Sequence, residues 1–204
     1  MSLAVELLAF AGVMALGQFS PGPDMILLTR TALKQGARAG AEMALGISCG
    51  LTFHSVIAVA GVALALERSS LLRFVLHWVA SAYLIWLAIG IGREIFRPGE
   101  VRETGAEETT RRPFVRGLLC NLLNPKAAIF LAAVSAPFLK GARPDWWPFA
   151  ICGIVVGQGC VLWSLWAVLL QWNPLRSAYE RSVKWIDGAF ALVLVGLAVR
   201  LVWS

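Results

Sequence analysis

Ser-Pro-Gly-Pro-Asp at residues 20–24 interrupts the first long apolar stretch of the chain, Leu3 to Leu28. A second proline motif, Asn-Pro-Lys at residues 124–126, interrupts another apolar stretch, Gly117 to Leu139. Proline has no N–H and its ring clashes with the preceding helical turn, so each motif leaves backbone groups without helical partners. Apolar helices that are broken by Pro and Gly at matching places in two halves of a chain are typical of the binding sites of membrane transporters.

The composition is that of an integral membrane protein. Hydrophobic residues make up 58% of the chain and charged residues 15%, with a mean hydropathy of +0.72, whereas soluble domains carry roughly 25% charged residues. Each apolar run approaches or exceeds the roughly 20 residues that a membrane-spanning helix needs, and none alternates as β-barrel strands do. We therefore predict one all-α membrane domain over residues 1–204. Its six spans are Leu3–Leu28, Ala41–Leu66, Phe74–Gly92, Gly117–Leu139, Trp146–Trp172 and Trp185–Trp203.

The two halves of the chain can be aligned with an offset of about 104 to 107 residues. Three helices in each half is an odd number, so the second half must enter the membrane in the opposite orientation. We predict two inverted three-helix repeats, residues 1–92 and 116–204, joined by a linker at 93–115, with the first and fourth helices broken by the proline motifs. The offset aligns Pro21 with Pro125, and the G-x-x-x-G pair Gly46 and Gly50 with the pair Gly153 and Gly157.

Basic residues predict the orientation, because Lys and Arg in short loops stay on the cytoplasmic side. Twelve of the 18 Lys and Arg residues lie in the loops of one side, five lie on the other side, and Lys126 lies within a span. Both termini are thus predicted to be non-cytoplasmic, and the linker at 93–115, rich in Arg and Glu, is predicted to be cytoplasmic. The net charge of +6 follows from this bias and requires no nucleic-acid partner.

The helix breaks suggest a zwitterionic ligand. An unpaired backbone group in hydrocarbon costs several kcal/mol, so such backbone persists only inside protein or beside a wet cavity. Freed N–H groups at the start of a half-helix attract a carboxylate, and freed carbonyls at the end of one attract an ammonium. An amino acid carries both groups. The alternative interpretation of either motif alone is a simple kink, which membrane helices tolerate.

Charged residues inside the spans strengthen the case for a site. Lys126 lies roughly 15 to 20 Å from either end of its span, too deep to snorkel, and an intramembrane charge costs at least about 2.5 to 3.5 kcal/mol. We hypothesise that Asp24 and Lys126 form an ion pair or a shared polar site, where substrate or a proton competes for Asp24. Glu42, near the cytoplasmic start of the second span, is a second candidate for proton exchange or is simply solvated. His54 is expected to be neutral and hydrogen-bonded to a neighbour.

Other functional classes fit less well. Gly46 to Gly50 reads G-x-S-x-G, but this motif forms a nucleophile elbow only between a strand and a helix, and here it lies within an apolar helix. The four cysteines form no C-x-x-C pair, and the chain has no cluster of metal ligands. We therefore predict no enzyme, catalytic residue, cofactor or resident metal. A cation or metal permease, and a membrane assembly factor whose breaks are kinks, remain as alternatives.

The motifs resemble those of the LysE/RhtB family of amino-acid exporters. The resemblance rests on SPGPD at 20–24, RGLLCNLLNPKAAIF at 116–130 and DGAFALVLVGLAVRLV at 187–202, and it covers essentially the whole chain. It implies a six-helix protein of the bacterial inner membrane that exports amino acids or relatives such as homoserine, driven by the proton gradient, as a homodimer. The chain departs from the family pattern at Ala80–Ala82 and at Ala136–Phe138, which affects packing and substrate identity.

Together these arguments predict a secondary transporter of a neutral amino acid or a homoserine-like compound, working by proton antiport with alternating access. Its partners are the amino acid, the proton and the lipid bilayer. The residues alone leave open the substrate side chain, the direction of transport and the coupling ion. The predicted substrate-binding residues are Ser20, Pro21, Gly22, Pro23, Asp24, Asn124, Pro125 and Lys126, and the predicted proton-coupling residues are Asp24 and Glu42.

Overall fold

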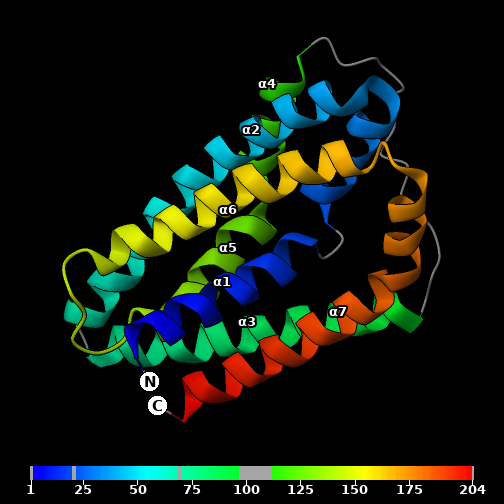
Figure 1. Cartoon of the computed structure of the whole chain (residues 1–204). Coiled ribbons are helices and arrows are strands. Elements are labelled where there is room, and N and C mark those ends of the chain that lie inside the picture. The colour runs from blue at the N-terminus through cyan, green and yellow to red at the C-terminus, as the bar shows by residue number, and fades with distance from the viewer. Residues whose placement is uncertain (1, 20–21, 69, 97–111, 204) are drawn as a thin grey trace.

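The computed structural model describes residues 2–19, 22–68, 70–96 and 112–203, and this part of the chain is helical with no strand (Figure 1). The N- and C-termini lie at the same end of the molecule (Figure 1). The side of the membrane that this end faces stays a prediction. The helices are α1 (Leu3–Phe19), α2 (Pro23–Arg68), α3 (Ser70–Phe96), α4 (Pro113–Leu122), α5 (Pro125–Ser135), the 3-10 helix η1 (Ala136–Phe138), α6 (Trp147–Leu169) and α7 (Asn173–Val202).

Both proline motifs end one helix and begin the next, as predicted. Helix α1 ends at Phe19 and α2 begins at Pro23, while α4 ends at Leu122 and α5 begins at Pro125. Proline is tolerated at the first helical position, because its missing N–H would have no helical partner there. The axis turns by 62° between α4 and the helical segment that runs from Lys126 to Phe138.

The predicted loop over residues 29–40, between the first and second spans, is far shorter in the structure. These residues lie within α2, but Gly36 has a non-helical conformation (φ 88°, ψ 173°) and forms a kink that divides α2 into two helices. This segment is rich in Ala, Arg, Lys and Gln, which favour helix, and glycine adopts a positive φ without a steric penalty. A kink at Gly36 therefore connects the two parts of α2 in place of the predicted loop.

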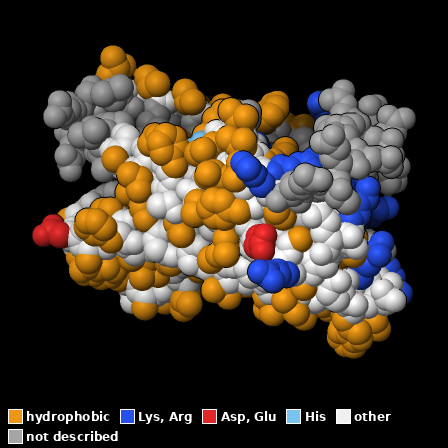
Figure 2. Space-filling view, turned by 90° about the horizontal axis from the view of Figure 1, so that it is seen from above, with side chains coloured by type: hydrophobic (Ala, Val, Ile, Leu, Met, Phe, Trp, Pro, Cys, Tyr) orange, Lys and Arg blue, Asp and Glu red, His pale blue; other side chains and the backbone are white. Residues whose placement is uncertain are grey.

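Within the described ranges, two helices are long and apolar enough to cross a membrane, namely α2 over Pro23–Gly61 and α6 over Trp147–Leu169. The number rises to four among the described residues if each bent pair, α4 with Lys126–Phe138 and the two parts of α7, is one span. Large apolar side chains stand exposed on four helices: Phe53, Trp86, Phe149 and Leu192 are 56–77% exposed. Hydrophobic side chains are spread over the face seen in Figure 2, and water-soluble monomers rarely expose apolar surface so widely.

Helix α2 is the centre of the packing and contacts α4, α5 and α6, while α3 packs on α7 and α1 on α6 and α7. Glycines allow α2 and α4 to approach closely. A Cβ on Gly46 would collide with the Phe114 carbonyl, and one on Gly50 would lie 2.5 Å from Asn121 Oδ1. The second predicted G-x-x-x-G pair differs, because Gly153 and Gly157 are exposed and a Cβ there would meet no atom of the described residues within 4 Å.

Candidate functional site

The two helix breaks surround a cavity of about 70 Å³. A site of about 10–15 Å³ by this kind of measure holds one water, so the cavity has room for several. It is lined by parts of α1, α2, α5, α6 and α7, with polar side chains at the breaks and apolar ones elsewhere. The lining residues are Met14, Gly17, Gln18, Gly22, Pro23, Asp24, Met25, Leu51, Asn124, Lys126, Ala127, Phe130, Leu131, Trp163 and Phe190.

Asp24, in the first turn of α2, joins the two breaks. It is only 8% exposed, and its Oδ2 accepts hydrogen bonds from Asn121 Nδ2 at 2.8 Å and Asn124 Nδ2 at 3.0 Å. These two bonds bring the two interruptions into contact. Its other oxygen, Oδ1, is buried and has no hydrogen-bond partner in the described part of the chain. One oxygen of this carboxyl group is therefore held by two amides, and the other is buried without such a bond among the described residues.

The two asparagines are themselves held in place. The Asn124 side chain caps α5, because its Oδ1 accepts the N–H of Lys126 at 3.1 Å, and this bond turns its amide nitrogen toward Asp24. Asn121 is fully buried against Gly50, and its backbone carbonyl accepts a hydrogen bond from His54 Nε2 at 3.0 Å. Because a carbonyl only accepts, His54 carries a proton on Nε2. The predicted hydrogen bond of His54 to a neighbour is confirmed.

Lys126 and Asp24 share the cavity, and the hydrogen bonds to Asp24 come from the two neutral amides. The hypothesis that Asp24 and Lys126 form an ion pair or a shared polar site stays a prediction. The Tyr83 hydroxyl of α3 donates to the Lys126 carbonyl at 3.3 Å and so attaches α3 to the second break. The partial positive charge at the N-termini of α2 and α5 adds to that of the ammonium.

The carbonyls at the end of α1 already have partners. Trp163 Nε1 of α6 donates to the carbonyl of Gln18, and the Tyr179 hydroxyl of α7 donates to that of Phe19, both at 3.2 Å. The idea that freed carbonyls bind an ammonium therefore does not apply to these two groups. Among the described lining residues, Asp24 Oδ1 and Gln18 Oε1 are buried acceptors without a hydrogen-bond partner, and of these two only Asp24 Oδ1 belongs to a carboxyl group.

Gln18 is a lining residue that the sequence analysis missed. Its side chain is only 5% exposed, and neither atom of its amide has a hydrogen-bond partner within the described residues. The sequence signal that could have indicated Gln18 is its position, because it is a polar residue two positions before the proline motif in an otherwise apolar stretch.

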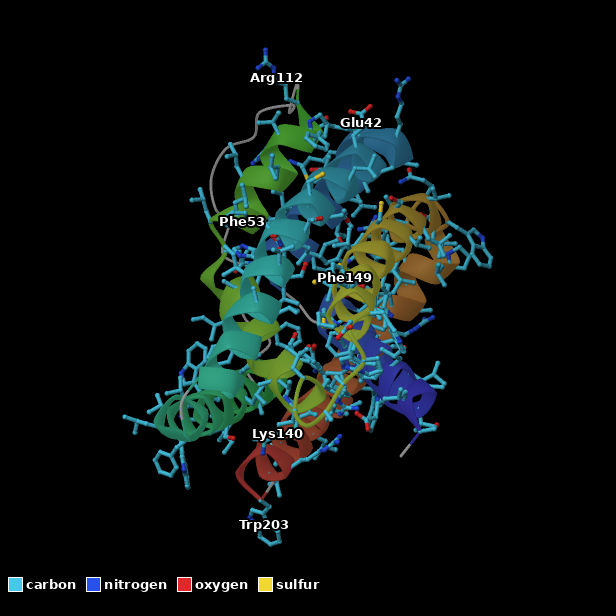
Figure 3. All side chains as sticks on the ribbon, turned by 90° about the vertical axis from the view of Figure 1, so that its left-hand side faces the viewer. Glu42, Phe53, Arg112, Lys140, Phe149 and Trp203 are labelled. Atoms are coloured by element: carbon cyan, nitrogen blue, oxygen red, sulfur yellow. The ribbon has the colours of Figure 1, made fainter. Side chains whose placement is uncertain are left out.

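The structure brings together most of the predicted site residues. Glu42 is an exception, because it pairs with the exposed Arg38 at 3.3 Å and is not among the residues that line the cavity. Figure 3 shows it near Arg112, at the end of the molecule opposite Lys140. Pro125 begins α5. Gly22, Pro23, Asp24, Asn124 and Lys126 line the cavity, and Ser20 and Pro21 lie outside the described residues.

The other motifs considered in the sequence have ordinary structural roles. Ser48 of the G-x-S-x-G motif donates to the carbonyl of Ala44, four residues earlier in the same helix, at 2.8 Å. The residues that the structure describes include no group of three or more His, Cys, Asp or Glu side chains that could hold a metal ion.

The fold and the cavity are those of a helical membrane protein with an internal polar site. A family model, "LysE type translocator", matches residues 15–204, so the chain belongs to this family. No solved structure matches the chain significantly.

Curated relatives match along most of their length. The threonine efflux protein of Escherichia coli strain K12 is 28% identical over 203 residues, covering 97% of each chain. The homoserine/homoserine lactone efflux protein of Salmonella typhi is 30% identical over 180 residues, 87% of each chain. The uncharacterized membrane protein YrhP of Bacillus subtilis is 25% identical over 208 residues, covering 96% of this chain and 97% of the relative.

Proposed function

We propose that this protein is a secondary transporter that exports a small neutral amino acid, or a close derivative such as homoserine, across the bacterial inner membrane. The observation that carries the proposal is the half-satisfied carboxylate of Asp24, which faces a cavity where two broken helices begin. Membership of the LysE type translocator family, and the efflux names of the relatives above, support export of this class of compound.

The bound substrate lies with its ammonium on Asp24 Oδ1. Its carboxylate lies toward the N-termini of α2 and α5, where the helix dipoles and the Lys126 ammonium attract negative charge. This pose uses one charged side chain from each break. It places the substrate side chain against the apolar lining, which includes Met14, Phe130 and Phe190.

Transport proceeds by alternating access between two inverted repeats, residues 1–92 and 116–204, each with three spans. The order of elements supports this division, because each half begins with a helix that a proline motif breaks, and the breaks meet at Asp24 and Asn124. Rocking one half against the other exposes the cavity to each side in turn. Both termini lie outside the cytoplasm, and the protein works as a homodimer.

Export is coupled to proton entry through Asp24. A carboxylate that has lost the substrate ammonium keeps one unpartnered, buried oxygen, and a proton is the other ligand that neutralises it. Substrate and proton thus compete for Oδ1. Glu42 is the second proton-coupling candidate from the sequence, and its position outside the cavity makes it the weaker one.

A thermal-shift screen of the purified protein against the twenty amino acids and homoserine tests the binding step, because a ligand of the folded state raises the melting temperature. We expect a saturable shift with one or a few neutral amino acids. A shift with divalent cations and none with any amino acid would instead favour a cation permease, and no shift with either would favour an assembly factor.

Uptake of the identified amino acid into everted membrane vesicles tests the coupling. We expect uptake to require a proton gradient and to stop when an uncoupler collapses it. Uptake that continues unchanged with the uncoupler would exclude proton antiport while leaving amino-acid transport intact.

A further inference from the structure

Among the described residues that line the cavity, Gln18 is the one whose side-chain amide nitrogen and oxygen both lack hydrogen-bond partners. It lies near the end of α1, and its Nε2 is 3.6 Å from the position that a Cβ on Gly159 would occupy, so α6 passes close by without a side chain. We propose that Gln18 is a specificity-determining residue that binds a polar group, a hydroxyl first, on the substrate side chain. This inference rests on the proposed function.

Two other glutamines differ from Gln18 because their amide nitrogens are bonded, although Gln158 Oε1 is also buried without a partner among the described residues. Gln158 Nε2 donates to the Ala11 carbonyl at 3.0 Å, and Gln171 Nε2 donates to the Ala32 carbonyl at 3.0 Å, so both amides hold helices together. The Gln18 amide makes no such bond, although its backbone carbonyl is tied to Trp163. Leaving a buried donor and acceptor unpaired is unfavourable, and such groups in proteins normally have a role outside the packing.

A hydroxyl matches this amide chemically. The amide donates from its nitrogen and accepts on its oxygen, and a hydroxyl can both donate and accept, so a single hydroxyl can bond to either the nitrogen or the oxygen of Gln18. The ammonium and carboxylate of the substrate are assigned to Asp24 and Lys126. Much of the remaining lining is apolar and includes Met14, Phe130 and Trp163. A hydroxyl on the substrate side chain would therefore form its hydrogen bond with Gln18.

The same geometry penalises apolar substrates of equal size. A methyl group in place of the hydroxyl fills the space but leaves the amide unpaired after water has been displaced from it. Sites that hydrogen-bond a polar group reject analogues that lack it, for this reason. We expect threonine to be preferred over its isostere valine, and homoserine over its isostere norvaline, by about tenfold or more, the ratio that one buried hydrogen bond supplies.

The test compares these two isosteric pairs in the wild type, in Gln18→Leu and in the matched control Gln158→Leu. Dissociation constants come from the quenching of tryptophan fluorescence, for which Trp163 in the cavity wall is a reporter. In Gln18→Leu we expect the threonine-to-valine ratio to fall to about one, with valine bound at least as tightly as before. Gln158→Leu makes the same chemical change outside the cavity wall and should keep the wild-type ratio.

Each outcome decides the question. A wild-type ratio that survives in Gln18→Leu, or equal binding of both members of each pair by the wild type, overturns the role of Gln18 while amino-acid binding stands. If the wild type binds no amino acid at all, the proposed function itself fails. Should Gln18→Leu not fold, Gln18→Met removes the same hydrogen bonds with an unbranched side chain, and the same loss of ratio is required of it.

Discussion

Two buried carboxylates of the first half, Glu6 and Asp24, are exposed to nearly the same small extent, 7% and 8%, yet they are paired very differently. Glu6 Oε2 lies 2.6 Å from the guanidinium of Arg143, a full positive charge. Asp24 receives two neutral amide N–H groups on one oxygen and, among the described residues, none on the other. A buried charge with a complete partner has a structural role, whereas one left incomplete beside a cavity is suited to a ligand.

The surroundings of the Glu6 pair confirm that it connects elements. Arg143 also donates from Nε to the Lys140 carbonyl at 2.9 Å and lies 4.8 Å from the ring of Trp147. Trp147 is fully buried, and its indole N–H donates to the Phe138 carbonyl at 2.8 Å. These contacts join α1 to the segment between η1 and α6, and none of the side chains involved lines the cavity.

The largest expected effect comes from Asp24→Asn, which removes the charge with little change of shape. Losing a buried, hydrogen-bonded charge partner costs roughly 2 to 5 kcal/mol of binding, so we expect amino-acid affinity to fall at least about thirtyfold and transport to be lost. Folding stability should change far less, because Asn retains an oxygen for the Asn121 and Asn124 donors. Binding titration and vesicle transport measure the first effect, and thermal melting measures the second. Wild-type affinity in this variant would remove Asp24 from the site.

Glu6→Gln tests the structural role of the other buried carboxylate. Removing one partner of a buried ion pair leaves an uncompensated charge, and we expect the free energy of unfolding to fall by about 3 kcal/mol with substrate affinity unchanged. Arg143→Met added to it should restore part of the stability, because it removes the unpaired guanidinium. Denaturant unfolding of the two single variants and the double variant measures the coupling. A loss of affinity in Glu6→Gln at unchanged stability would contradict the assignment.

The two carboxylates also show which features of the site can be predicted from the sequence alone. Asp24 was predicted as a site residue because it follows a recognisable break, and local chemistry is readable from neighbours in the chain. The partner of Glu6 is 137 residues away, and that of Asp24 on α4 is 97 away, so neither pair has a local signal. For the same reason Asn121, which lies three residues before the second motif, was not expected to donate to Asp24. The kink at Gly36 was not predicted, because a single glycine connects the two parts of α2 where a loop was expected.

The support of Asp24 gives a third prediction, at Gly50. A Cβ there would lie 2.5 Å from Asn121 Oδ1 and 2.9 Å from its Cβ, so Gly50→Ala must displace Asn121, which donates to Asp24. Overpacking of this kind costs about 1 to 3 kcal/mol, and we expect both stability and amino-acid affinity to fall. Gly157→Ala is the matched control, since a Cβ there contacts no described atom within 4 Å. Equal effects of the two changes in detergent would show that the close approach of α2 and α4 is not what positions Asn121.

The smallest expected effect is that of Tyr83→Phe. The hydroxyl of Tyr83 holds the Lys126 carbonyl at 3.3 Å, much as Arg143 holds the Lys140 carbonyl beside Glu6, but with a neutral and longer hydrogen bond. Such a bond contributes about 1 kcal/mol, so the melting temperature should fall slightly and amino-acid affinity by less than about fivefold. Tyr179→Phe, which removes the bond to the Phe19 carbonyl at the first break, is the control of equal chemistry. A loss of binding in Tyr83→Phe as deep as that in Asp24→Asn would mean that the position of α5, rather than the charge of Asp24, limits recognition.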